Sequence, residues 1–449
     1  MKIRQLCIFV VNVPIKPNYY NFCLLVLFIA VFYIPVYGQY EYKEAETYKL
    51  YLENSANLYA QQFDKNIRKQ YSDVISVKNN ELIDRLTAGN FLFDTLARPY
   101  LNSIFSHILL SNSLNSAHYH FFIDRTSEVN AYSFEDGTIV CNLGLLAGME
   151  NESQLAMVFC HEIAHYLLMH SNNAIVNRLT KYNSREFLAK IKQIKTQEYN
   201  TKKQLESLLM TDVFDRSRHS RLQERAADSL GMILFSKTRY SGKTIPHIFD
   251  FLKSATALTN AITIQSFFDK EKFKVDDLAE ILLVKRMRFG TAEKKEIADS
   301  LKTHPDCDKR KKEMQEFFML KPKPGEDFIT GSLEKLNNVK KLALFEEAKY
   351  AKDNGNLGLY LYHLIQNDAL FPANRQIKSE IYNTLTSLYK HQQSHTFQEV
   401  VHPSYIPENE NDQYAALLKI LDNLNLKQLD ELVKTYYTNN NVFITIAKN

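Results

Sequence analysis

The sequence predicts a mostly α (α+β) protein in which a small β-sheet lies beside one central helix and a C-terminal α-helical domain follows. Only 12 of the 449 residues are Gly and 11 are Pro, so few residues interrupt helices. Strand-like composition is confined to one short region, residues 118–141. A chain of this length is too long for a single simple core, so we expect more than one domain.

Residues 1–38 have the pattern of an export signal. Its basic residues are Lys2, Arg4 and Lys16. An uninterrupted apolar run from Phe22 to Val36 follows, and Gly38 ends a small-residue pattern typical of a cleavage site. The run is shorter than the about 20 residues that a membrane span needs, so we expect a signal peptide and a periplasmic or secreted protein. An uncleaved N-terminal anchor is the alternative.

Charge and hydropathy argue against two classes of protein. Without the three basic residues of the export segment, the 55 Lys and Arg residues fall to 52, against 51 Asp and Glu residues. This balance offers no basic patch for nucleic acid. After Gly38 no stretch approaches the length of a membrane span, so no multi-spanning membrane domain is expected.

Three predicted strands precede the most informative helix. They are His118–Asp124, Asn130–Phe134 and Thr138–Cys141, which are rich in aromatic or β-branched residues. Glu135-Asp136-Gly137 predicts a hairpin turn between the last two. The region before the strands, from about Glu41 to Leu114, has helical spacing and is expected to pack around the core.

A short sheet of this kind can present an edge strand to which an extended peptide pairs by main-chain hydrogen bonds. On this interpretation Asn130, Ala131 and Tyr132 bind the substrate. A small hairpin with a structural role only is the alternative. His118 and His120 alternate with aromatic residues, so we expect them on the solvent face of a strand rather than at a metal.

Residues 151–170 predict one amphipathic helix. Asn151 can cap its N-terminus, with Gln154 three residues later, as in a capping box. Apolar residues then recur at helical spacing, namely Leu155, Val158, Phe159, Ile163, Tyr166 and Leu167. The helix therefore has a face to bury.

His161-Glu162-x-x-His165 lies within this helix and has the spacing of a metal site. Four residues of a helix turn by about 400°, so the two histidines project from one face and can share an ion. Glu162 lies beside the first ligand, where its carboxylate can reach a metal-bound water. The alternative is two core histidines in this order by chance. On a continuous helix His170 lies about 180° from His161, so we expect it to face away.

A second predicted helix, residues 219–231, follows a charged helical stretch to which we assign no site. It carries Glu224 and Asp228 one turn apart. A catalytic zinc site commonly takes three protein ligands and leaves the fourth position open, which makes Glu224 the candidate third ligand. Asp228 can then accept a hydrogen bond from the free ring N–H of His161. A solvated acidic face is the alternative reading of such a pair.

Four separated motifs resemble the M48 family of peptidases, in the order that the family has them. They are Asn130-Ala-Tyr, His161-Glu162-x-x-His165, Glu224-x-Ala-Ala-Asp228 and Thr303-His304-Pro305-x-x-x-x-Arg310. The resemblance covers roughly residues 45–320. It implies a zincin-type core and a gluzincin endopeptidase with one Zn²⁺ per chain.

The resemblance also implies roles for individual residues. His161, His165 and Glu224 would be the zinc ligands, and Glu162 the general base. His304 would either stabilise the oxyanion or occupy the open zinc position in a resting state, and Arg310 would hold the substrate or the loop. Family members such as HtpX and the CAAX prenyl proteases carry several membrane helices, so this chain looks like the soluble exported branch.

Beyond Gly331 the sequence predicts successive amphipathic helices. They are Leu342–Asp353, Leu357–Gln366, Ile377–Tyr389, Gln413–Leu421 and Leu426–Tyr437. Their spacing is too irregular for tetratricopeptide repeats, so we expect a helical packing or interaction domain, and a protein partner for it is left open. The predicted organisation is an export segment at residues 1–38, a metallopeptidase domain at 39–320 and this domain at 331–449.

We therefore expect a zinc metalloendopeptidase that hydrolyses peptide bonds in exported or envelope proteins, with a role in protein quality control. A non-catalytic zinc-containing chaperone or assembly factor of the envelope is the alternative. Glu162 argues against that alternative, because a structural site has no use for a carboxylate beside the metal. Hydrolysis of a small non-peptide substrate is a third reading that the motif leaves open.

Overall fold

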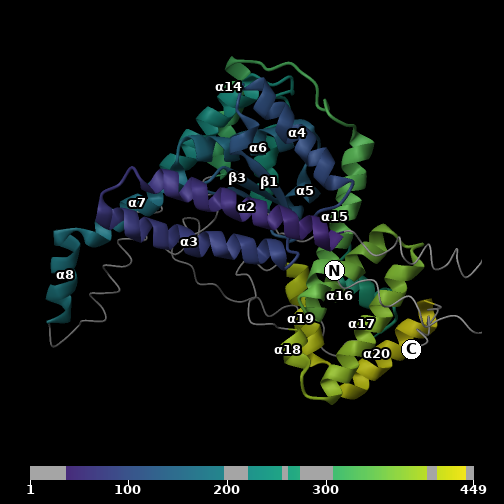
Figure 1. Cartoon of the computed structure of the whole chain (residues 1–449). Helices are drawn as coiled ribbons and strands as arrows, with labels where there is room; N and C mark the ends of the chain where they lie inside the picture. Colours follow the sequence, from purple (N-terminus) through teal and green to yellow (C-terminus); the bar gives the residue numbers. More distant parts are fainter. Residues whose placement is uncertain (1–36, 197–220, 255–260, 274–306, 402–411, 441–449) are drawn as a thin grey trace, which may run out of the picture.

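The computed structural model describes residues 37–196, 221–254, 261–273, 307–401 and 412–440 (Figure 1). His304 and almost all of the expected export segment lie outside these residues. Within them, no helix combines the length and the apolar character that crossing a membrane requires. The fold is mostly helical with one small sheet, as predicted.

The elements fall into three groups along the chain. The first group comprises α2 (Tyr37–Ala60), α3 (Lys65–Thr87), α4 (Ala97–Ser111), the 3-10 helix Ser116–His118, β1 (His120–Asp124), β2 (Ala131–Ser133), β3 (Thr138–Asn142), α5 (Leu143–Gly148), α6 (Glu152–Leu167), α7 (His170–Asn183) and α8 (Arg185–Lys195). The second comprises a helix over residues 221–236, α10 (His247–Ser254), α11 (Ile264–Lys270) and α14 (Cys307–Leu320). The third comprises α15 (Leu333–Asp353), α16 (Leu357–Leu370), α17 (Arg375–Gln393), α18 (Phe397–Val401), α19 (Asp412–Asn423) and α20 (Leu426–Asn440).

The sheet has the strand order β1-β3-β2, which leaves β2 at one edge. β3 is parallel to β1 and antiparallel to β2, with Ala131 opposite Cys141, so the predicted hairpin is confirmed. Its turn requires Gly137, which has a φ of +93° and whose Cβ would lie 2.2 Å from the His118 carbonyl oxygen. Every residue of β3 is buried, because α2 covers one side of the sheet and α6 the other.

The prediction for His118 and His120 is confirmed only in part: His118 is exposed but lies outside the strand, and His120 is in the strand but does not face solvent. The chain enters β1 at His120, two residues later than expected, and His118 ends the 3-10 helix. The His120 ring packs against the rings of Tyr48 and Tyr51 in α2, with centroid distances of 4.9 and 4.2 Å. Alternation along the strand could not reveal that α2 lies over this face.

Helix α6 runs through the first core, the buried apolar cluster that it forms with α4, α5, α10, α14 and the sheet (Figure 1). Asn151 caps it as predicted, accepting a 3.1 Å hydrogen bond from Gln154 N. Glu152 is fully buried in the first turn and accepts hydrogen bonds from Tyr240 Oη, Ile329 N and Thr330 N. A carboxylate at this end also complements the helix dipole. The N-terminus of α6 is therefore anchored by segments distant in sequence.

The second core consists of α11 and α16–α20, with the C-terminal half of α15. Each helix predicted beyond Gly331 is present and longer than expected. α15 belongs to both cores, since Leu336 and Val339 pack in the first and Ala348 and Ala351 in the second. In the second core, α11 from the predicted metallopeptidase domain packs with helices of the predicted C-terminal domain. The domain boundaries stay a prediction.

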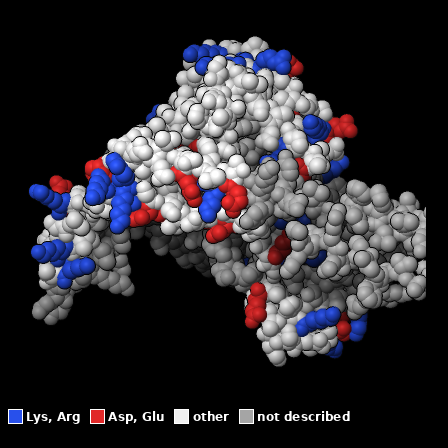
Figure 2. Space-filling model, viewed as in Figure 1, with Lys and Arg blue, Asp and Glu red and all other residues white. Residues whose placement is uncertain are grey.

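Charged side chains of both signs are interspersed over the centre of the face in Figure 2. Basic side chains extend from α8 at the left of that view, where its exposed residues include Lys190, Lys192 and Lys195. The sheet and α6 lie in the upper part of this view, above the central charges, where the surface is largely uncharged, so this face offers no broad field of one sign over them.

Candidate metal centre

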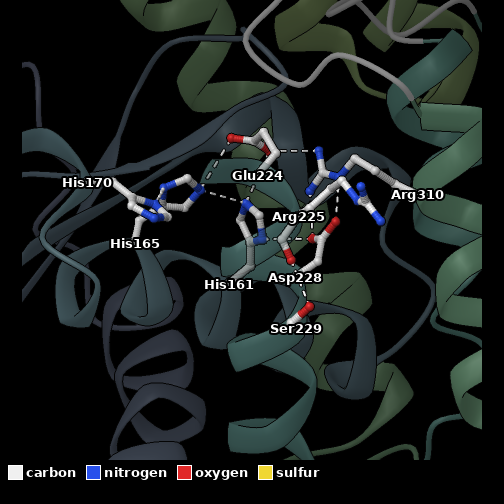
Figure 3. A network of polar contacts seen from close by, with 8 residues as sticks. All are labelled: His161, His165, His170, Glu224, Arg225, Asp228, Ser229 and Arg310. Carbon is white, nitrogen blue, oxygen red and sulfur yellow. Dashed lines mark hydrogen bonds and ion pairs between the residues drawn. The ribbon is translucent and has the colours of Figure 1, made fainter. Parts of the chain in front are cut away.

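Three side chains from two helices converge in the first core (Figure 3). His161 and His165 project from one face of α6, with their Nε2 atoms 3.0 Å apart. Glu224 reaches them from the helix at residues 221–236, with Oε2 3.5 Å from His161 Nε2 and Oε1 3.3 Å from His165 Nε2. All three donor atoms lie within 4.8 Å of one another.

The spacing of these donors fits a zinc ion. A tetrahedral ion with ligands at about 2.0–2.1 Å separates neighbouring ligand atoms by about 3.3 Å. The three separations, 3.0, 3.3 and 3.5 Å, surround that value. Two imidazole nitrogens and one carboxylate are also the donor set of many catalytic zinc sites, which keep a fourth position open. The residues present therefore fit one zinc ion with an open position.

Close approach of the two helices brings Glu224 to the histidines. Gly231 lies against the backbone of α6, where an added Cβ would stand 3.2 Å from His161 Cα. Ala227 is fully buried at the same interface. Small residues at this interface therefore let the two helices approach, and the role of Gly231 became clear only from the packing.

Asp228 and Arg310 lie on the far side of His161 from His165 (Figure 3). Asp228 Oδ1 is 3.0 Å from His161 Nδ1, which leaves His161 Nε2 directed toward the other two donors. Arg310, from α14, donates to both carboxylate oxygens of Asp228 at 2.7 and 2.8 Å. Its Nη1 lies 2.8 Å from Glu224 Oε2. One guanidinium therefore holds both carboxylates.

Arg310 is held by the two carboxylates. Its side chain is 5% exposed and its nitrogens face Asp228 and Glu224. It lies in the first turn of α14. The expected contact with the substrate or with the loop that carries His304 stays a prediction, because His304 lies outside the described residues. A bidentate pair across 82 residues leaves no local signature.

Burial and ion pairing shift the pKa values of His161 and Asp228 in opposite directions. Burial alone lowers the pKa of His161, but contacts with Asp228 and Glu224 outweigh it and raise that pKa to about 10. Burial alone raises the pKa of Asp228, but hydrogen bonds from Arg310 and His161 bring it down to about 2. In the metal-free protein Asp228 is therefore charged and His161 carries a proton, which a metal ion must displace.

Glu162 and β2 lie beside the three donors. The Glu162 side chain is buried on α6 and borders a small cavity together with His161 and Ala131. Tyr132, the next residue of β2, points to the other face of the sheet, where its hydroxyl accepts a hydrogen bond from Arg85. The carbonyl of Asn130 accepts from Asn142 N at 3.0 Å and ties the start of the strand to the sheet.

His170 was expected to face away, and that prediction was wrong. Its Nδ1 lies 2.9 Å from Nδ1 of His165. α6 ends at Leu167, and Met169 adopts a left-handed conformation with a φ of 53° before α7 begins. The chain therefore reverses direction, and the angle calculated for a continuous helix does not apply.

His170 can orient His165 for metal binding. With Nε2 of His165 directed at the metal, its Nδ1–H donates and His170 Nδ1 accepts. Burial, followed by the charge of His165, lowers the pKa of His170 to about 4, which keeps the acceptor nitrogen unprotonated at neutral pH. His170 thus has the geometry and the protonation state of a positioning residue.

Replacement of His170 by alanine is expected to weaken zinc binding by roughly 10–100-fold, because loss of such a partner frees the ligand ring to rotate. Competition with a chromophoric chelator would measure the zinc Kd. His247→Ala is the matched control, since His247 is exposed and contacts Glu150 away from the donors. An unchanged zinc Kd in His170→Ala would show that the contact does not position His165.

Comparisons with known proteins cover the part of the chain that carries these residues. Residues 96–317 match the model of Peptidase family M48. The beta-barrel assembly-enhancing protease of Escherichia coli (strain K12) is 34% identical over 82 residues, which is 18% of this chain and 17% of that protein. The Yersinia pestis protein of the same name is 29% identical over 84 residues, 19% of this chain and 17% of its own length. The matched stretch thus spans less than a fifth of these relatives.

Proposed function

Residues 96–317 belong to peptidase family M48, and from this membership we propose that the protein is a zinc-dependent metalloendopeptidase. The observation that carries the proposal is the convergence of His161, His165 and Glu224 with the Glu162 carboxylate beside them. The same cluster without Glu162 would suit a structural metal equally well.

His161, His165 and Glu224 would hold the zinc ion. When bound, zinc supplies Lewis-acid chemistry, polarising the scissile carbonyl and making a water molecule acidic at neutral pH. Glu162 accepts the proton of that water and later delivers it to the leaving amine. Its burial beside the cavity keeps competing water away and places the carboxylate next to the first histidine.

Asp228, Arg310 and His170 would position the ligands. Asp228 fixes the ring of His161, Arg310 fixes the carboxylates of Asp228 and Glu224, and His170 fixes the ring of His165. We propose a positioning role for Arg310. Each zinc ligand then has its orientation set by a neighbour before metal arrives, as is general for catalytic zinc.

The substrate would bind as an extended peptide along β2. This strand is at the edge of the sheet and packs beside α6. Main-chain groups on an unpaired edge can add a further strand, which would lay a peptide across Asn130, Ala131 and Tyr132 next to Glu162. A peptidase family implies a polypeptide substrate, and this edge offers a way to hold one.

Exported or envelope proteins are the proposed substrates, with a role in their quality control. The support is the export pattern of residues 1–38 together with relatives that are named for enhancing beta-barrel assembly. We propose that the helices of the second core provide the surface for a protein partner.

Chelation provides the direct test of the metal requirement. Removing metal from the purified protein should stop hydrolysis of casein, and one equivalent of Zn²⁺ per chain should restore it, because the donors form one site. The control is the same chelator saturated with zinc. Hydrolysis at the untreated rate by protein shown to be metal-free would refute the proposal. Failure to hydrolyse casein in any metal state would favour the non-catalytic chaperone.

A further inference from the structure

A small cavity lies between the proposed catalytic carboxylate and the edge strand, with a volume of about 40 Å³. On the catalytic side it is bordered by His161 and Glu162, and on the strand side by Ala131. The lining side chains that are apolar include Val158 from α6, Ile248, Phe249 and Leu252 from α10, and Met314 from α14. The cavity is thus lined largely by apolar side chains and has His161 and Glu162 at one end.

Two of the charged groups at this cavity, Arg310 and Asp228, are paired with each other. They form the bidentate ion pair described above, and the Phe249 ring lies 5.2 Å from the Arg310 guanidinium. A charged side chain entering the cavity would therefore lose its hydration and find no unpaired partner among these residues, which is costly. An acidic one would also meet the Glu162 carboxylate.

Strand geometry determines which substrate side chains reach the cavity. Successive residues of a strand point to opposite faces. Ala131 borders the cavity, whereas the hydroxyl of Tyr132 contacts Arg85 on the other face. A peptide added beside β2 has the same alternation, so every second side chain points to the Ala131 face. One of these lies next to the bond that faces Glu162.

We propose that this cavity is a specificity pocket that accepts one aliphatic side chain of the substrate, at a residue adjacent to the scissile bond. The volume of about 40 Å³ leaves room for a few carbon-sized groups. Valine, leucine or isoleucine fits this volume, and an aromatic ring does not. The proposal rests on the proposed peptidase function and adds the class of substrate residue to it.

The test uses fluorogenic peptides that differ at one position, with Leu, Phe or Asp placed in turn on either side of the scissile bond. At one of the two positions kcat/KM should be about 100-fold higher for Leu than for Asp, because apolar burial is gained and the cost of a buried charge is avoided. Equal kcat/KM for the two peptides at both positions would overturn the proposal.

Variants of Leu252 test the pocket itself, because this residue is only half-buried where it borders the cavity. Leu252→Ala enlarges the cavity and should shift the Phe-to-Leu ratio of kcat/KM about tenfold toward Phe. Leu252→Phe fills the cavity and should shift the preference toward smaller residues. The control is Asp250→Asn on the same helix, whose side chain is 59% exposed and outside the cavity. Unchanged ratios in both Leu252 variants would overturn the proposal.

Binding measurements separate failure of the pocket from failure of the enzyme. If no peptide and no casein is hydrolysed, the peptidase proposal fails, and fluorescence anisotropy of the labelled peptides still compares Leu with Asp. Tighter binding of the Leu peptide that weakens in Leu252→Phe would support the pocket alone. Equal binding of the Leu and Asp peptides would overturn it.

Discussion

Replacing Glu162 by glutamine should abolish proteolysis and leave zinc bound. The amide retains the shape of the side chain but cannot accept the proton of the attacking water, so kcat should fall by roughly 10²–10⁴-fold. The two histidines and Glu224 are untouched, so one zinc per chain should remain. Casein hydrolysis and metal analysis on the same preparation would measure both quantities.

The matched control is Glu316→Gln in α14, because that carboxylate is 59% exposed and makes only a long pair with Lys312. It should keep full activity. Undiminished hydrolysis by Glu162→Gln would exclude the general-base role. Loss of zinc from Glu162→Gln would instead assign the carboxylate to metal binding.

Replacing Arg310 by methionine should cause the largest loss of stability. The substitution leaves Asp228 and Glu224 as buried carboxylates without their guanidinium partner, and breaking a buried pair in this way typically costs about 3–5 kcal/mol. The free energy of unfolding should therefore drop by about that amount in metal-free protein. Denaturant titration followed by circular dichroism would measure it.

Zinc separates this electrostatic cause from a loss of packing. Bound zinc stabilises wild type and variant alike by mass action, but in the variant its charge also replaces part of the positive charge lost beside Glu224. The stability difference between wild type and Arg310→Met should therefore be smaller at saturating zinc than in metal-free protein. Lys312→Met on the same helix is the control, because its side chain is 77% exposed and such surface pairs contribute about 0–1 kcal/mol. Equal stability of Arg310→Met and Lys312→Met would show that the pairing is not needed.

The sequence predicted those parts of the site that depend on local periodicity. His161, Glu162 and His165 lie in a helix whose cap and apolar spacing are both readable, and the helix is present with that cap. The hairpin was predictable because Gly137 occupies a turn that excludes a side chain. Periodicity failed at His170, because a left-handed Met169 without a glycine gives no warning that the helix ends.

Long-range pairing was beyond sequence reasoning. Arg310 joins carboxylates more than 80 residues away, and Glu152 binds backbone amides at Ile329 and Thr330. Neither the sequence of α14 nor that of the first turn of α6 indicates which residues Arg310 and Glu152 contact. Such contacts are decided by which elements pack together, and local sequence pattern does not encode that.

One helix, α15, contributes to both cores and so links the second core to the region around α6. α15 has 21 residues, so it is a continuous rod about 30 Å long. Its N-terminal end follows Gly331, which packs against Glu152 at the start of α6. Its C-terminal end packs with α16, and Arg125 bonds to Glu346 and Asp353 along it. A partner that displaced the second core would therefore also shift α15, and with it the contact between Gly331 and Glu152 at the start of the helix that carries both histidines.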